Sequence, residues 1–186
     1  ELALAYPDYD IVEAAELAAT HWRFKGLGKL YLGLGTGGRC VPLGSKYLSE
    51  RGSVLLGDAI ELDEHFASEA VMYTLVKLEP RPSQAIVLGV GYRPGFSDTG
   101  NSPGMRAAAG FKQLSNCVAI CDPHVHPSEI LRLISQYEIP CGMVALLDET
   151  FNLEAFDVVV LSVAHPEFAD LWKWLRPGTV VLDATG

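Results

Sequence analysis

The sequence predicts an α/β fold, with a Rossmann-like parallel sheet domain in its second half and a helical segment before it. Short apolar runs rich in β-branched residues alternate there with short helical patterns, which is typical of βαβ units in a parallel sheet covered on both faces. The expected strands cover 85–91, 117–123, 157–165 and 179–186, and the expected helices begin at Ser102 and cover 128–137 and 166–175.

The first 80 residues follow a different pattern. Helical periodicity is visible over 10–22 and over 57–80, and an apolar stripe of the second pattern is expected to face a core. The run EPRPS at 79–83 ends this pattern, so we expect a helical segment over 1–80 and an α/β domain over 81–186. The stripe consists of Leu62, Phe66, Ala70 and Tyr73, with Val71, Leu75 and Leu78 beside it.

Composition and charge exclude several classes of function. The chain has 186 residues, of which 49% are hydrophobic, and a formal net charge of -9, which argues against a nucleic-acid partner. No apolar run reaches the ~18 residues of a membrane span, so no membrane partner is expected. The four cysteines form no CxxC pair, which favours reduced thiols and a cytoplasmic location. Because the chain does not begin with methionine, we expect it to be a piece of a longer protein.

Polar residues follow the expected strands at their carboxyl ends, where parallel sheets bind ligands. Residues 89–101, Asp122, His165 and 183–186 are expected around this one rim. A metal site is not expected there, because a buried Cys121 with surface histidines fits the run CDPHVH better than a set of convergent ligands including His124 and His126.

The loop after the first expected strand invites a dinucleotide reading. Gly89 and Gly91 fit the first two glycines of a GxGxxG turn, but Pro94 stands where the third belongs. Arg93 suits a pyrophosphate, because a guanidinium can donate two hydrogen bonds at once. A solvated surface arginine fits the same position.

The stretch GLGTGGRC places four glycines within 33–38 and ends at Cys40. So much glycine costs conformational entropy and suits a backbone that approaches a ligand closely. Pro42 and Ser45 indicate the start of a helix, and a helix N-terminus favours a thiolate, as does the neighbouring Arg39. The residues alone leave Cys40 as either a nucleophile or a buried structural cysteine.

Several motifs, in order along the chain, resemble the UDP-glucose/GDP-mannose dehydrogenase family. GTGGRCVP at 35–42 resembles the signature GxGGxCxP, and VLGVGYRPGFSDTGNSP at 87–103 resembles LGxxYKxxxxDxRxSP. CDPHV, FDVVVLSVAHPEF and VVLDATG resemble YDPxV, ADAVVLxxxHxEF and VVDxRG. With His165, the motif VAHPEF resembles that of the UDP-N-acetylhexosamine branch more than that of the UDP-glucose branch. The UDP-N-acetylhexosamine branch makes uronic acids for surface polysaccharides.

The resemblance implies an NAD-dependent oxidation of the C6 hydroxyl of a UDP-sugar to a uronic acid, through a thiohemiacetal and a thioester on Cys40. It also implies a homodimer formed through the helical segment and a UDP-binding α/β domain. NAD would be bound mainly by a domain absent from this chain, so the chain alone is expected to be inactive. The implied substrate-binding residues are Tyr31, Gly33, Leu34, Gly35, Thr36, Gly37, Gly38, Tyr92 and Arg93.

Three positions depart from the family pattern. Gly44 stands where the family has an aspartate that assists proton transfer, Gly100 replaces an arginine that contacts the cofactor, and Thr185 replaces an arginine that contacts the substrate. One alternative is therefore a catalytically degenerate member that binds a nucleotide sugar or only dimerises. A plain NAD-binding module is a further alternative.

Overall fold

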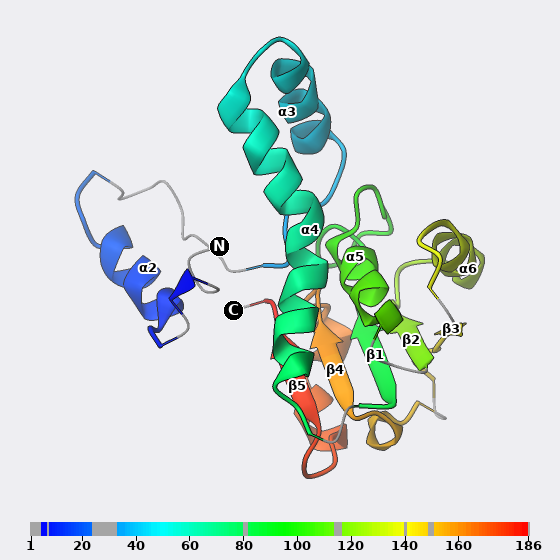
Figure 1. Cartoon of the computed structure of the whole chain (residues 1–186). Coiled ribbons are helices and arrows are strands. Elements are labelled where there is room, and N and C mark those ends of the chain that lie inside the picture. The colour runs from blue at the N-terminus through cyan, green and yellow to red at the C-terminus, as the bar shows by residue number, and fades with distance from the viewer. Residues whose placement is uncertain are drawn as a thin grey trace.

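A five-stranded parallel sheet forms the centre of the second half of the chain (Figure 1). The computed structural model describes residues 5–6, 8–23, 33–79, 82–113, 117–139, 141–148 and 151–185. The strands lie in the order β3-β2-β1-β4-β5, with bounds Gln84–Leu88 for β1, Cys117–Cys121 for β2, Gly142–Val144 for β3, Val158–Leu161 for β4 and Val180–Asp183 for β5.

The strand order places a topological switch point between β1 and β4. The chain runs from β1 through β2 to β3 on one side and then returns to β4 and β5 on the other. Leu88 at the end of β1 lies opposite Cys121 on one side and Leu161 on the other. The loops that follow these residues leave the sheet at one edge, which is where open α/β sheets bind ligands. The predicted Rossmann-like fold is confirmed.

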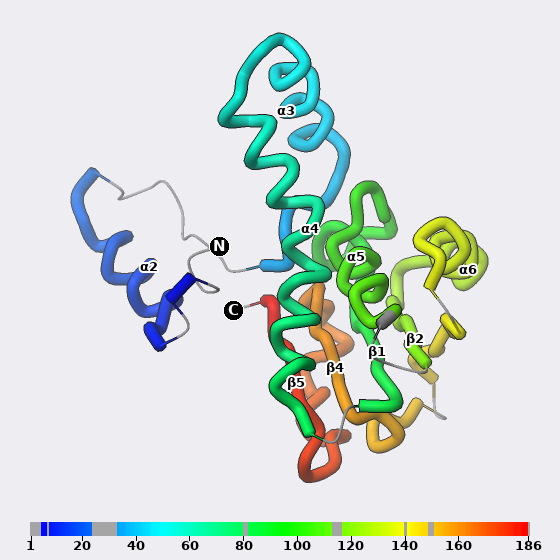
Figure 2. The backbone as a smooth tube through the Cα atoms, viewed as in Figure 1, coloured from blue at the N-terminus to red at the C-terminus, as the bar shows by residue number. Residues whose placement is uncertain are grey.

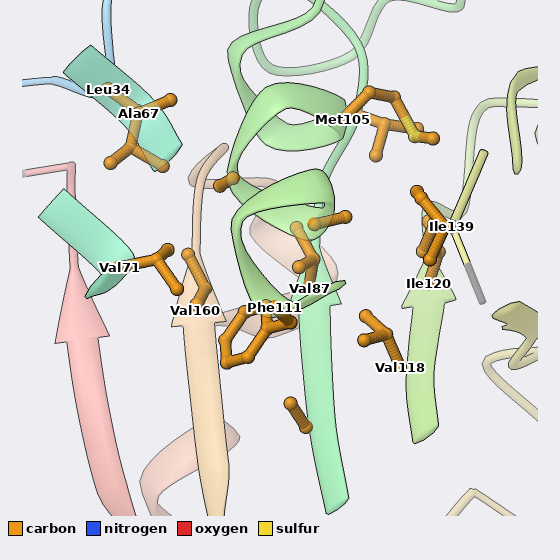
Figure 3. Packing of buried hydrophobic residues seen from close by; sticks show 14 of the residues in the cluster. Leu34, Ala67, Val71, Val87, Met105, Phe111, Val118, Ile120, Ile139 and Val160 are labelled. Atoms are coloured by element: carbon orange, nitrogen blue, oxygen red, sulfur yellow. The ribbon is translucent and has the colours of Figure 1, made fainter. Parts of the chain in front are cut away.

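One face of the sheet is covered by helices α4 (Val54–Val76), α5 (Pro103–Gly110) and α6 (Pro127–Gln136). Figure 3 shows Val71 of α4 and Phe111 in the same core as Val87 and Val160 of the sheet. A Cβ atom at Gly110 would lie 2.9 Å from the Cα of Ser68, so this glycine lets α5 approach α4 closely.

The opposite face is covered by three 3-10 helices: η2 (Leu153–Ala155), η3 (Pro166–Phe168) and η4 (Leu171–Trp174). Leu153, Phe168 and Leu171 are buried there against Ile86 and Leu88 of β1. The expected covering of both faces is confirmed, but the α-helix expected over 166–175 is wrong. The short strand β3 was not expected at all.

Helices α3 (Cys40–Glu50) and α4 form a hairpin that extends beyond the sheet (Figure 2). The expected stripe of α4 is confirmed for Ala70, Val71 and Leu75, which are buried, but Leu62 and Tyr73 are 40% and 39% exposed. Further exposed apolar side chains of the hairpin are Val41, Leu43, Tyr47, Leu48, Val54, Leu55 and Val76.

The pattern over 10–22 forms α2 (Ile11–Ala19), which the Asp10 side chain caps and in which no residue is buried. Among the helices that the structure describes, none offers a stretch apolar and long enough for a membrane crossing. Even the 23-residue α4 carries acidic residues along its length.

Candidate functional site

The glycine-rich loop 33–38 is anchored at its start by one apolar side chain and one carboxylate. Leu34 is buried beside Ala67 of α4 (Figure 3). The amide of Thr36 donates to Asp63 Oδ1 at 2.6 Å, and Arg106 Nη2 donates to the carbonyl of Thr36 at 3.3 Å. The loop is therefore held between α4 and α5 through its backbone.

The end of the glycine-rich loop docks on the segment that joins β1 to α5. The amide of Gly38 donates to the carbonyl of Gly100 at 2.8 Å, and Asn101 Nδ2 donates to the carbonyl of Gly38 at 2.8 Å. Tyr92 packs on the same backbone: a Cβ atom at Gly37 would lie 3.0 Å from its Cβ. At Gly38, which has φ +81°, an added Cβ would lie 3.3 Å from the Tyr92 ring. Glycine thus permits both the turn and the approach.

Cys40 is the first residue of α3 and is exposed. The reading of Cys40 as a buried structural cysteine is therefore wrong. The preceding side chain, Arg39, crosses Gly100, where a Cβ atom would lie 2.9 Å from its Cγ. Arg39 Nε lies 3.4 Å from Asp98 Oδ1 in an exposed ion pair. The start of α3 therefore carries an exposed thiol, and the side chain of the residue before it lies along the segment that joins β1 to α5.

A buried carboxylate organises the edge of the sheet at the switch point. Asp122 follows β2, and its Oδ2 accepts hydrogen bonds from the amides of Val90 at 2.7 Å and Gly91 at 2.9 Å. Its Oδ1 accepts from the amide of His124 at 2.9 Å, and His165 Nε2 lies 3.3 Å from Oδ2. The expected grouping of residues 89–101, Asp122 and His165 on one rim is confirmed.

Arg93 lies in a tight turn at this edge. The turn closes with a hydrogen bond from the amide of Phe96 to the carbonyl of Arg93 at 3.3 Å, and Gly95 has φ +76°. Pro94 followed by a glycine with positive φ is typical of a type II turn. The exposed guanidinium lies 3.6 Å from the Phe96 ring centroid and 5.2 Å from that of Tyr92. The two aromatic rings thus limit where the charge can point.

The loop after β1 does not form the pyrophosphate turn of a dinucleotide fold. Gly89 has φ +86°, but the close approach between strand and helix is made by Gly104, where a Cβ atom would lie 2.5 Å from the Gly89 carbonyl oxygen. The N-terminus of α5 is already capped, because Ser102 Oγ accepts from the amide of Met105 at 3.2 Å. One amide at the N-terminus of α5 is therefore used by Ser102, and the glycine that permits the approach lies later in the chain than the third position of GxGxxG.

Three possible metal ligands gather beside the same edge. Ligand atoms of His124, His165 and Glu167 lie within 4.8 Å of one another. Both nitrogens of His165 already face partners, the amide of Gly95 at 3.2 Å and Asp122, so we assign no metal there. Of the residues in the run CDPHVH, Cys121 is buried, and the His126 side chain caps α6 by accepting from the amide of Ser128.

A cavity of about 370 Å³ lies behind the glycine-rich loop, between α3, α4 and α5. Thr36, Asp63 and Arg106 form its wall on the side of the loop, and Lys46 reaches it from α3. Sequence reasoning did not single out Asp63 or Arg106, because only the packing of α4 against α5 brings them to Thr36.

Of the predicted site residues, the structure brings Gly37, Gly38 and Tyr92 into contact and places Arg93 in the adjoining turn. Tyr31 lies outside the described residues. Gly33, Gly35 and Thr36 are exposed, whereas Leu34 is buried and serves as an anchor for the loop.

The comparison with known proteins decides the family. A model of the UDP-glucose/GDP-mannose dehydrogenase family, UDP binding domain, matches residues 86–186. The chain belongs to this family. The matched range of the family domain runs from β1 to the end of β5, and it includes Tyr92 and Arg93.

Relatives extend the match toward the N-terminus. The UDP-N-acetyl-D-mannosamine dehydrogenase of Pyrococcus horikoshii is 31% identical over 185 residues, which cover 93% of this chain and 39% of that protein. A UDP-glucose dehydrogenase structure from Pyrobaculum islandicum superposes with a TM-score of 0.69 and 19% identity, covering 95% of this chain and 40% of that one. A UDP-D-ManNAc dehydrogenase structure from Pyrococcus horikoshii superposes with a TM-score of 0.67 and 23% identity, covering 98% of this chain and 42% of that one. The two structures show a shared fold, and this chain spans about two fifths of the length of these relatives.

Proposed function

We propose that this chain is the substrate-binding part of an NAD-dependent nucleotide-sugar 6-dehydrogenase, with Cys40 as the nucleophile. The docking of the glycine-rich loop 33–38 on Tyr92, Gly100 and Asn101 supports this proposal most directly, because it joins the Cys40 thiol to the ligand-binding edge of the sheet. The exposed backbone of the loop suits a sugar diphosphate, since amides can approach it without side chains in the way.

The proposed chemistry uses the thiol of Cys40 at carbon C6 of the sugar. Two molecules of NAD, bound one after the other, would each accept one of the two hydrides that leave C6, and we propose that NAD is held mainly by a domain outside this chain. After the first oxidation, Cys40 Sγ adds to the C6 aldehyde, and the carbonyl oxygen takes a proton to give a thiohemiacetal. Loss of the second hydride from C6 and of the hydroxyl proton leaves a thioester. Water then adds, the C–S bond breaks, and the uronic acid leaves with the thiol restored.

Arg93 and Tyr92 are proposed to hold the nucleotide part of the substrate. Arg93 is exposed at the switch point, where its guanidinium can donate two hydrogen bonds to a diphosphate.

The preference for a UDP-N-acetylhexosamine substrate is also a proposal. It is supported by the name of the 31% identical relative, a UDP-N-acetyl-D-mannosamine dehydrogenase. We also propose a role in polysaccharide biosynthesis, a cytoplasmic location, and a division of the chain into a helical segment over 1–80 and an α/β domain over 81–186.

A homodimer through the helical segment is proposed on the exposed apolar side chains of the α3–α4 hairpin. Leu43, Val54 and Leu55 are 69%, 75% and 80% exposed, which is unusual for a surface that faces only water. Analytical ultracentrifugation of the chain is expected to show a dimer. A monomer at micromolar concentration would contradict this part of the proposal.

Calorimetric titration with UDP, UDP-glucose, UDP-N-acetylglucosamine and NAD tests substrate binding. The uridine ligands are expected to bind and NAD is not. Arg93→Ala should weaken the binding of UDP about tenfold or more, because a hydrogen bond to a charged group contributes about 1.5–3 kcal/mol. Arg51→Ala is the matched control: it removes the same charge from the far end of α3, where Arg51 stacks on Tyr47. Wild-type protein that binds no uridine ligand would contradict the proposal.

The alternative of a degenerate member rests on Gly44, Gly100 and Thr185, and the surroundings of Gly44 bear on it most directly. Gly44 lies one turn after Cys40, and no atom lies within 4 Å of where its Cβ would be, so no described side chain supplies a carboxylate in that space. Removing a general acid or base typically costs ~10²–10⁴-fold in rate. Oxidation of a UDP-sugar by the full-length protein with NAD, abolished by Cys40→Ser, would support the dehydrogenase. Uridine binding without turnover would support the degenerate member.

A further inference from the structure

The side chains of Asp122 and His165 form a pair with no exposed surface under the loop that carries Arg93. Asp122 accepts hydrogen bonds from the amides of Val90 and Gly91 at the end of β1. His165 lies at the end of the segment after β4, on the other side of the switch point. The pair thus connects the segments that follow three strands.

The hydrogen bonds of His165 fix its tautomer. The amide of Gly95 donates to Nδ1 at 3.2 Å, so Nδ1 is an acceptor. The proton of the neutral ring then lies on Nε2, which faces Asp122 Oδ2 at 3.3 Å. Nε2 of His165 therefore binds the buried Asp122, and Nδ1 binds the turn that carries Arg93.

The bond to Gly95 reaches the turn at the point where it is otherwise unsupported. In a type II turn the amide of the third residue is not used by the closing hydrogen bond. Here Phe96 closes the turn on Arg93, and His165 takes the remaining amide, that of Gly95. A Cβ atom at Gly91 would lie 2.5 Å from the Phe96 carbonyl oxygen, so the turn folds tightly back over the end of β1.

Other side chains fix the plane of the imidazole ring. The ring of His124 lies 4.8 Å from that of His165, and His124 Nε2 lies 3.1 Å from Glu167 Oε1. The ring of Phe168 meets His165 edge-on at 5.6 Å. The imidazole is thus held on two sides, with its Nδ1 directed at the turn.

We propose that His165 is a positioning residue for nucleotide binding: through Nδ1 it holds the turn 93–96 so that Arg93 faces the diphosphate of the substrate. This inference rests on the proposed function, because it takes the diphosphate as the ligand of Arg93. His165 touches no substrate in this role and acts only through the Gly95 amide.

Two substitutions separate the two bonds of the ring. In His165→Asn, Oδ1 stands near the place of Nδ1 and can accept from Gly95, while the bond to Asp122 is lost. In His165→Gln, the amide group stands near the place of Nε2 and can donate to Asp122, while the bond to Gly95 is lost. Phe168→Leu is the matched control, because it loosens the packing around the ring without touching either bond.

Hydrogen exchange of the Gly95 amide and the Kd for UDP are the two measurements. We expect His165→Gln to speed hydrogen exchange of the Gly95 amide about tenfold or more. It should also raise the Kd for UDP about as much as Arg93→Ala does. His165→Asn and Phe168→Leu should leave exchange at Gly95 and the Kd within about threefold of wild type, even where they lower the melting temperature.

Two outcomes overturn the inference. In one, His165→Gln leaves both measurements unchanged; in the other, His165→Asn and Phe168→Leu change them as much as His165→Gln does, which is the result of a merely structural role. Wild-type protein that does not bind UDP overturns the proposed function and the link to the diphosphate. In that case the exchange at Gly95 still decides whether His165 holds the turn.

Discussion

Arg106 of α5 pairs with Asp63 of α4 across the glycine-rich loop, with Nη2 at 3.2 Å from Oδ2. The other carboxylate oxygen of Asp63 accepts the amide of Thr36, and Arg106 donates to the carbonyl of the same residue. Both backbone groups of one loop residue are therefore bound by one ion pair. The side chain of Arg106 is only 14% exposed, so the pair also keeps a poorly hydrated charge neutralised.

Replacing Asp63 should destabilise the fold. Asp63→Ala leaves the Thr36 amide without its acceptor and the Arg106 charge without its partner, which we expect to cost about 1–3 kcal/mol of unfolding free energy. Asp63→Asn keeps an acceptor and should cost less. Urea denaturation measures both, with Lys173→Ala, which opens an exposed pair with Asp170, as the control expected to stay within about 0.5 kcal/mol. Equal losses of unfolding free energy for Asp63→Ala and Lys173→Ala would contradict the stabilising role of the Asp63–Arg106 pair.

Filling the space at Gly100 should displace Arg39. A Cβ atom there would lie 2.9 Å from the Cγ of Arg39, so Gly100→Ala is expected to move this side chain away from Asp98. Arg39 is exposed beside the glycine-rich loop, and we expect it to contribute to the binding of UDP. Gly100→Ala and Arg39→Ala should then weaken UDP binding by similar factors, and the double variant should bind no more weakly than either single variant.

Calorimetry of the two single variants and the double variant provides the check. Gly52→Ala serves as a control for backbone strain alone, because Gly52 has φ +100° and no atom lies within 4 Å of where its Cβ would be. Effects of Gly100→Ala and Arg39→Ala that add up fully in the double variant would show that Gly100 acts independently of Arg39.

Asp122 makes the stability of the fold depend on pH. Burial alone would raise the pKa of its carboxyl, but hydrogen bonds from His165 and from backbone amides outweigh burial and lower the pKa below its ordinary value. The unfolded chain, with a pKa of about 3.9, then binds more protons than the folded one as the pH falls. The stabilisation is complete above about pH 5, where the carboxyl is ionised in both states, and it is lost as the pH falls through the unfolded and then the folded pKa.

Asp122→Asn removes this titration. The difference in unfolding free energy between wild type and Asp122→Asn should therefore shrink as the pH falls below about 5. Urea denaturation over this range measures the difference. A constant difference would mean that the carboxylate does not titrate with folding.

The fold could be predicted from the sequence where the elements are locally distinct. The run over 85–91 and the Ser102–Pro103 helix start carry β-branched and capping signals that need no tertiary partner, and the structure confirms both. The strand β3 has only three residues, and the apolar run over 143–147 extends beyond its end, so the pairing with β2 rather than the local pattern defines the strand. The segment 166–175 has a helical pattern but forms two separate 3-10 helices, whose Phe168 and Leu171 lie in one buried cluster with Ile86 and Leu88 of β1.

The candidate site divides in the same way. The rule that ligands bind at the carboxyl ends of parallel strands was enough to place Asp122 and His165 on one rim. It could not show that His165 accepts the amide of Gly95, because that bond depends on the fold of the turn. Asp63 looks like one more acidic residue on a solvated helix, and only the approach of α5 gives it a partner in Arg106.

The central claim, that Cys40 lies in the site of the nucleotide sugar, is tested most directly by alkylation with iodoacetamide at about pH 8, followed by peptide mapping. Cys40 and Cys141 are exposed and should react, whereas burial, with a smaller contribution from Asp122, raises the pKa of the Cys121 thiol to about 12 and should leave it unmodified. UDP-N-acetylglucosamine at ten times its Kd should slow alkylation of Cys40 about tenfold and leave Cys141 unchanged, because occupied protein is protected in proportion to its population. Alkylation of Cys40 at an unchanged rate, with the ligand bound as calorimetry measures it, would contradict the proposed site.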